Sequence, residues 1–394
     1  MRILFINTHF PGTLGPLLSF LAAEERHECF FVSGYKRQGY SMPGVRHILL
    51  GGGVEKRPHY RSLAQEMEAM HAAGCQALSA FEKLKAGGIV PDMVVSTLFG
   101  NYALFWEQAF PDSFRVCWTE SAETLLHDTP QNALETTRQG LLCRQVLGCH
   151  LLVSLSAGKL NEAMPGFLHQ RVELPYPVND DWFAPRTVES LAFDNLDLAQ
   201  AKEVVLLSAG RGLACSAGLE QFLRTLLVTR RACHIVLLTE GRIGQGETAR
   251  ALAPLLADYP ERLLVVGTLS LARYRDLLAL ATLMLVPGQS PLPSSVLFEA
   301  MSTGVPLVLS PQNATESCLR HGTNCLCLPE LALCEEVEPI VASITHLLED
   351  TALCEHIGRE ARATIVKHFS QKKLLPSHAR YLLDACTAWQ KGKA

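Results

Sequence analysis

Short apolar runs recur along the first half of the chain, and segments with helical spacing of their apolar positions separate them. The runs cover Arg2–Asn7, Glu28–Ser33, Pro91–Ser96 and Phe114–Ser121. A short apolar run that ends in turn residues is typical of a strand buried on both faces of a parallel sheet. Strands that alternate with helices in this way predict an α/β protein.

The same alternation continues in the second half of the chain. Further apolar runs predict strands at the start of Glu203–Gly212 and over Cys233–Thr239, Arg262–Val266, Leu283–Val286 and Val305–Leu309. Between the two sets, Pro175–Pro185 is rich in proline and has a polar centre, which predicts a stiff linker at the surface. A chain of 394 residues is too long for one ordinary core. We therefore predict one domain over residues 1–175, a second over 176–370, and a C-terminal helix over 371–394.

The stretch Pro291–Ser310 carries the clearest chemical signal. Its pattern predicts a Pro/Gly/Ser loop, a short helix over Ser294–Ser302 and then the next strand. In a parallel sheet such a loop lies at the carboxyl edge, where the free N–H groups of the helix suit a phosphate. Ser294 and Ser295 are good capping residues, and Glu299 lies one turn further, near enough to bind a ribose. The alternative is an ordinary turn that binds nothing.

This stretch resembles the donor-site signature of nucleotide-sugar glycosyltransferases with the GT-B fold, most closely family 4. Phe298–Val308 matches the second half of that signature, and Gly210–Arg211 matches the family's Gly-Arg after a strand. Three positions depart from the family: Pro291 replaces a glutamate, Ala217 replaces a lysine, and Thr119, Glu120 and Ser121 stand where many members have a histidine. The resemblance implies a GT-B fold, in which two Rossmann-like domains face a cleft and a final helix crosses back to the first domain.

The resemblance also implies a set of donor contacts. They are Gly12, Thr13, Gly210, Arg211, Gly267, Ser294, Ser295, Val296 and Glu299. Arg211 would act in catalysis, since a guanidinium and a helix N-terminus together stabilise a departing diphosphate without a metal ion or cofactor. Two alternatives stay open here: Gly12 serves only its turn, and Arg211 is an ordinary surface arginine.

Glu120 is a second candidate for catalysis. It follows the strand that begins at Phe114, at a point where many family 4 members carry a histidine. A carboxylate at this exit can act in catalysis or bind the acceptor. The alternative is a helix cap or a salt-bridge partner.

The amino-acid composition indicates which kinds of partner and which cellular compartment to expect. The chain is 48% hydrophobic with a net charge of −4. It lacks the excess of basic residues that is typical of proteins that bind nucleic acids. Its 13 cysteines form no CxxC pair, which favours free thiols in a reducing compartment over a zinc site. The apolar runs are too short to span a membrane, and the chain enters a strand at once without a signal peptide. We expect a cytoplasmic protein. The basic loop 51–61 could meet an anionic acceptor or a membrane headgroup at the inner face of the membrane, and the alternative is an ordinary solvated loop.

The resemblance implies transfer of a sugar from a nucleotide diphosphate sugar to a glycan, lipid or protein acceptor, with retention at the anomeric carbon. The departures at Pro291 and Ala217 leave other interpretations open. One is a catalytically degenerate relative that serves as a binding or scaffold subunit for a protein partner. Another is an epimerase of the same fold.

Overall fold

The computed structural model describes most of the chain. The described residues are 1–36, 41–50, 62–98, 101–119, 133–155, 170–193, 196–208, 217–239, 247–287, 294–311, 314, 316–328, 331 and 337–393. They form two compact units. Unit 1 comprises Met1–Pro177 and Lys372–Ala394, and unit 2 comprises Val178–Gln371.

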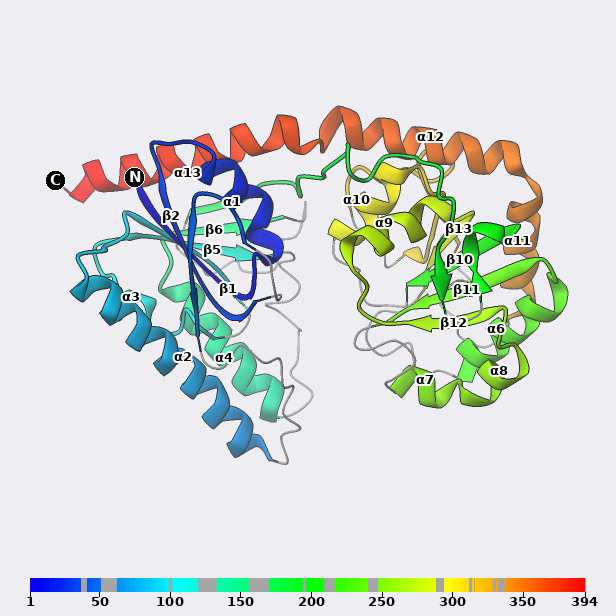
Figure 1. The fold of residues 1–394 in the computed structure, drawn as a ribbon, viewed down its shortest axis with the longest axis horizontal. Helices are drawn as coiled ribbons and strands as arrows, with labels where there is room; N and C mark the ends of the chain where they lie inside the picture. The colour runs from blue at the N-terminus through cyan, green and yellow to red at the C-terminus, as the bar shows by residue number, and fades with distance from the viewer. Residues whose placement is uncertain are drawn as a thin grey trace. The chain divides into compact units, whose positions relative to one another are not determined.

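Unit 1 contains a seven-stranded parallel sheet in the order β3-β2-β1-β4-β5-β6-β7 (Figure 1). The strands are β1 (Arg2–Phe10), β2 (Glu28–Lys36), β3 (Val45–Leu49), β4 (Met93–Thr97), β5 (Phe114–Thr119), β6 (Leu151–Ser154) and β7 (Gln170–Glu173). The chain moves outward from β1 to β3 and then returns to β4 on the other side of β1. Doubly wound sheets bind ligands at such a reversal, outside the carboxyl ends of the two strands.

Helices cover both faces of this sheet (Figure 1). They are η1 (Gly12–Leu14), α1 (Gly15–Ala22), α2 (Leu63–Ala86), α3 (Trp106–Ala109), α4 (Ala133–Leu147) and α13 (Gln371–Lys393). Ile3 and Phe5 of β1 belong to the core that α1 and α13 cover, whereas Leu4 and Ile6 belong to the core under α2, α3 and α4. Alternate residues of β1 thus face two apolar layers, which is why its sequence is a continuous apolar run.

Unit 2 repeats this topology with a six-stranded parallel sheet in the order β12-β11-β10-β13-β14-β15. The strands are β10 (Glu203–Ser208), β11 (Cys233–Leu238), β12 (Leu263–Val266), β13 (Leu283–Val286), β14 (Leu307–Leu309) and β15 (Leu326–Cys327). A separate small sheet pairs β8 (Ala192–Phe193) with β9 (Leu196–Asp197). The strand order of the large sheet reverses between β10 and β13.

The helices of unit 2 are η3 (Leu198–Gln200), α6 (Ala217–Thr229), α7 (Glu247–Ala251), α8 (Ala253–Asp258), α9 (Leu271–Leu280), α10 (Ser294–Thr303), α11 (Glu338–Glu349) and α12 (Thr351–His368). One face of the sheet packs against α6 and α11. Val205 and Leu207 of β10 join Phe222 of α6 and Ile344 of α11 in this core. The two parallel sheets and their helices agree with the predicted α/β class.

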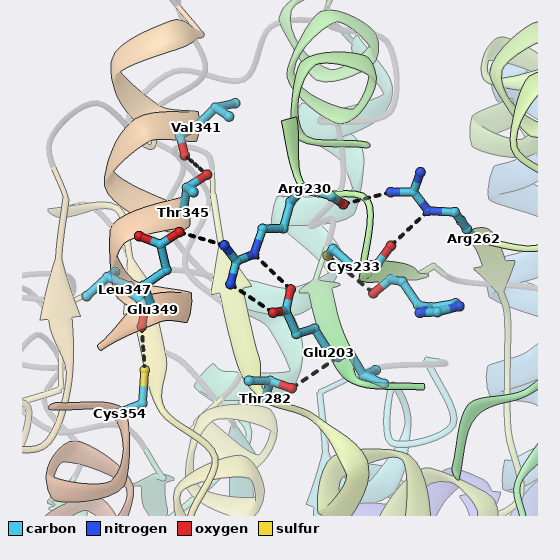
Figure 2. A network of polar contacts seen from close by, with 12 residues as sticks. Glu203, Arg230, Cys233, Arg262, Thr282, Val341, Thr345, Leu347, Glu349 and Cys354 are labelled. Carbon is cyan, nitrogen blue, oxygen red and sulfur yellow. Dashed lines mark hydrogen bonds and ion pairs between the residues drawn. The ribbon is translucent and has the colours of Figure 1, made fainter. Parts of the chain in front are cut away.

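An arginine network closes the amino edge of the unit 2 sheet (Figure 2). Arg230 donates to both oxygens of Glu203, at 2.9 and 3.1 Å, and to Glu349 at 2.7 Å. Arg262 donates to the main-chain carbonyls of Cys233 and Arg230, at 3.2 and 2.7 Å. Because Glu203 opens β10, the network lies at the edge opposite to the carboxyl ends and has a structural role.

The prediction of a surface linker over Pro175–Pro185 was wrong for part of the segment. Val178 is fully buried and the Asp180 side chain is only 8% exposed. The hydroxyl of Ser370 donates to Asp180 Oδ1 at 2.6 Å. The N–H of Val178 donates to the carbonyl of Phe369 at 2.8 Å, and the N–H of Gln371 donates to the carbonyl of Val178 at 2.7 Å. The segment that enters unit 2 therefore pairs with the segment that leaves it, which buries Asp180, while residue 181 stays exposed.

Within the described residues, no helix is both long and apolar enough to cross a membrane. The described cysteines are all free, and most are buried. Nor do three or more metal-binding side chains come together in the described part of the chain.

Candidate active site

The reversal point of unit 2 lies beside helix α10. Leu207 of β10 pairs with Leu285 of β13, so the carboxyl ends of the two strands lie at the same edge. β10 ends at Ser208 and β13 ends at Val286, and α10 begins at Ser294 after the β13 loop. The first N–H groups of a helix have no partners within it, and the helix dipole favours an anion there.

One face of α10 is accessible. Leu297, Phe298, Ala300 and Met301 are at most 1% exposed and fill the core. By contrast, residues 295, 296 and 299 are half-buried, and their spacing of three and four places them on one face. This face offers a hydroxyl, an apolar side chain and the carboxylate of Glu299 next to the start of the helix.

The far end of α10 is held firmly against α12. A Cβ atom added to Gly358 would lie 2.1 Å from the carbonyl oxygen of Gly304, so the two backbones touch without side chains between them. The guanidinium of Arg362 donates to the carbonyl of Ser302, and the rings of Phe298 and Phe369 lie 4.5 Å apart. A helix supported in this way keeps its side chains in place before a ligand arrives.

The carboxylate of Glu299 lies near the hydroxyl of Tyr274 on α9. Burial, followed by the negative charge of Glu299, raises the pKa of Tyr274 well above that of an ordinary phenol. The hydroxyl therefore keeps its proton at neutral pH.

A polar cluster occupies the corresponding edge of unit 1. Asn7 Oδ1 accepts from the hydroxyl of Thr97 at 2.8 Å and from the N–H of Thr8 at 2.7 Å. Asn7 lies on β1 and Thr97 on β4, the two strands between which the order reverses. Gly12 has φ of +55°, and a Cβ there would lie 1.9 Å from Asn7 Nδ2. The positive φ favours glycine at this position whether or not a ligand binds, and a Cβ there would also displace the Asn7 amide.

Comparison with protein families assigns each half of the chain. Residues 25–122 match the model described as "Glycosyl transferase family 4 group", and residues 203–350 match "Glycosyl transferases group 1". The second match contains β10, β13 and α10. The chain is a family 4-like GT-B glycosyltransferase.

Solved structures share its fold over nearly the whole length. Sucrose-phosphate synthase from Thermosynechococcus elongatus is 16% identical with a TM-score of 0.74, covering 98% of this glycosyltransferase and 100% of that chain. HepE of Anabaena, solved with UDP and glucose, is 15% identical with a TM-score of 0.68, covering 97% and 99%. A search of curated proteins found no match to the sequence of the glycosyltransferase.

The structure locates some of the predicted site residues of this glycosyltransferase and leaves others outside its described part. Gly12 and Thr13 lie in η1 of unit 1, after β1. Gly267 directly follows β12, and residues 294, 295, 296 and 299 lie on α10 in unit 2. Glu120, Gly210, Arg211 and Pro291 fall outside the described residues. Of the predicted donor contacts, the structure brings together those on α10, and their contact with a donor stays a prediction.

Two residues at these edges escaped the sequence analysis. Asn7 carries a recognisable signal, since it is the polar residue that ends the apolar run of the first strand. Tyr274 carries no such signal, because its position on a helix does not reveal that its hydroxyl is buried near Glu299 on another helix.

Proposed function

We propose that this glycosyltransferase moves a sugar from a nucleotide diphosphate sugar to a glycan, lipid or protein acceptor. The accessible face of α10, with Glu299 beside the reversal point of the unit 2 sheet, is the observation that carries the proposal. HepE of Anabaena, whose structure in complex with UDP-glucose matches this chain with a TM-score of 0.68, supports it.

In this proposal the diphosphate binds at the first turn of α10, at residues 294–296. The loop after β10, with Gly210 and Arg211, supplies a cation that stabilises the leaving group. The carboxylate of Glu299 accepts hydrogen bonds from the ribose hydroxyls, and the backbone at Gly267 meets the base. The helix N-terminus and the guanidinium carry the charge of the diphosphate, so no metal ion or cofactor enters the scheme.

Unit 1 supplies the remaining groups of the proposal. Gly12 and Thr13 approach the donor phosphates, and Glu120, which directly follows β5, acts toward the acceptor or the reacting sugar. Transfer with retention at the anomeric carbon follows from the family 4 resemblance.

A second function, that of a binding or scaffold subunit, has one specific feature in its favour. Pro291 stands where family 4 has a glutamate that contacts the donor sugar, and proline also lacks the N–H group of that position. Such a subunit would bind nucleotide without turning it over.

Thermal shift measurements with a panel of nucleoside diphosphates and nucleotide sugars test the proposal. A ligand present at 100 times its dissociation constant stabilises the folded protein by about 2.7 kcal/mol. Product analysis with the stabilising donor and a cell extract as acceptor source then separates the two functions. Sugar transfer supports the transferase, binding without transfer supports the subunit, and absence of binding to every compound contradicts both.

A further inference from the structure

Tyr274 has an unusual environment for a polar side chain on a helix. Its hydroxyl oxygen is buried, and no described atom stands in standard hydrogen-bond geometry to it. A buried hydroxyl without a hydrogen bond destabilises the folded state, so a tyrosine in such a position calls for a reason. Phenylalanine would fill the same space without that cost.

An aromatic contact and the start of helix α9 position Tyr274. Its ring packs edge-on against the ring of Phe183, with centroids 6.1 Å apart. Phe183 is itself fixed, since its N–H donates to the carbonyl of Asn179 at 2.9 Å and its carbonyl accepts from Arg362 at 3.4 Å. The main-chain N–H of Tyr274 donates to the carbonyl of Ser270 at 2.9 Å, at the capped start of α9.

The same arginine holds the helix that carries Glu299. Arg362 donates to the carbonyl of Ser302 in α10 as well as to that of Phe183. Arg362 thus holds both Phe183, against which the Tyr274 ring packs, and α10, which carries Glu299. The phenol keeps its proton because burial and the nearby carboxylate raise the pKa of Tyr274. It therefore has a proton to donate, and the carboxylate of Glu299 is a nearby acceptor.

We propose that Tyr274 is a positioning residue that donates its O–H to the carboxylate of Glu299 and thereby orients this carboxylate toward the ribose of the donor. In this arrangement the bond from the phenol fixes the plane of the carboxylate that accepts from the sugar hydroxyls. A side chain that a buried neighbour already holds in place loses less conformational entropy when the ligand binds. The proposal rests on the proposed function, since it assigns Glu299 to the ribose.

Calorimetry with matched nucleotides tests it. UDP, GDP and ADP are each compared with their 2′-deoxy and 3′-deoxy forms, first on the unchanged protein and then on Tyr274→Phe. The unchanged protein is expected to prefer the ribonucleotide over at least one deoxy form by about tenfold or more. Tyr274→Phe is expected to reduce this preference to within about threefold, with little change in the affinity of that deoxy form. Tyr259→Phe is the matched control, because it removes a phenol before the amino end of β12 and should keep the preference.

The outcomes separate the two levels of the proposal. If Tyr274→Phe retains the ribose preference of the unchanged protein, the positioning role is wrong while the ribose role of Glu299 survives. If the unchanged protein binds ribo and deoxy forms equally, the ribose assignment falls and the positioning role with it. A double-mutant cycle adds a second readout: on a Glu299→Gln background, Tyr274→Phe should change the ribonucleotide affinity by less than about twofold. An undiminished effect on that background would also overturn the proposal.

Discussion

Gly358 of α12 touches the main chain of Gly304 with no room for a side chain between them. The carbonyl oxygen of Gly304 lies 2.1 Å from the position that a Cβ on residue 358 would take. Gly304 itself has φ of +81°, the left-handed conformation that glycine adopts at a helix end. This contact sets how closely α10, the helix with the candidate donor-binding residues, approaches its support.

Gly358→Ala is expected to destabilise the protein by about 1–3 kcal/mol, because backbone must move to admit the methyl group. The displacement should also weaken nucleotide binding at α10. Gly140→Ala is the matched control: this glycine lies within α4, and a Cβ there has no neighbour within 4 Å. The control should gain about 0.5–1 kcal/mol from helix propensity. Denaturant unfolding measures both, and a neutral Gly358→Ala would contradict the packing argument.

Arg230→Met is expected to cost about 2 kcal/mol of unfolding free energy. The change leaves Glu203 without its two hydrogen bonds in a place where its side chain is 16% exposed. Arg359→Met should cost less than about 0.5 kcal/mol, since its ion pair with Glu355 joins two exposed side chains. Equal losses for the two variants in urea unfolding would mean that the network of Figure 2 adds nothing beyond a surface pair.

His378 gives the stability of the protein a dependence on pH. Burial lowers its pKa to about 4, and neither ring nitrogen has a hydrogen-bond partner among the described residues. The unfolded chain takes up this proton near pH 6.5 and the folded chain only near pH 4, so stability is lost as pH falls through this window. His378→Leu should remove about 2–3 kcal/mol of the difference in unfolding free energy between pH 7 and pH 4.

The same variant should be as stable as the parent at pH 7 or slightly more stable, because it removes unpaired polar atoms from the core. Some dependence on pH will remain, since burial also lowers the pKa values of His27 and His234. A His378→Leu variant with the full pH dependence of the parent would show that another group is responsible.

Arg211→Ala is expected to weaken the binding of a nucleoside diphosphate by roughly 10- to 100-fold. A hydrogen bond to a charged group is worth about 1.5–3 kcal/mol. A nucleoside has no phosphate for Arg211 to bind, so its affinity should not change. The affinity of the corresponding nucleoside, measured by calorimetry on the same samples, serves as the control. Equal loss for both ligands would remove Arg211 from the phosphate site.

Because Pro291 replaces the glutamate of the family, we expect the sugar to contribute little to the affinity for a nucleotide sugar. Without the carboxylate and the N–H group at this position, a free diphosphate should bind about as well as its nucleotide sugar. Calorimetry with UDP and UDP-glucose, and with the matching GDP and ADP pairs, measures the ratio. A nucleotide sugar that binds tenfold or more tightly than its diphosphate would show that the pocket recognises the sugar through other residues.

Local patterns in the sequence determined most of the secondary structure. The apolar runs became parallel strands because each is covered on both faces, as β1 is by its two cores. The helix expected over Ser294–Ser302 extends over Ser294–Thr303. The next strand begins at Leu307 and not at Val305, because the N–H of Val305 bonds back to Ala300 and completes the end of the helix. The family signature also identified the fold, since its spacing reflects the same strand, loop and helix.

Only the tertiary structure decided which polar residues are buried and which groups support the site. Asp180 reads as a surface residue among prolines, yet Ser370, 190 positions away, removes it from solvent. Arg362 anchors both the entry segment and α10, and the buried hydroxyl of Tyr274 on α9 lies near enough to Glu299 on α10 for the charge of Glu299 to raise the pKa of Tyr274. None of these contacts leaves a periodic trace along the chain. Each partner satisfies its own local pattern, and the energy that selects the contact, the cost of a buried polar group without a hydrogen bond, arises only once distant segments pack together.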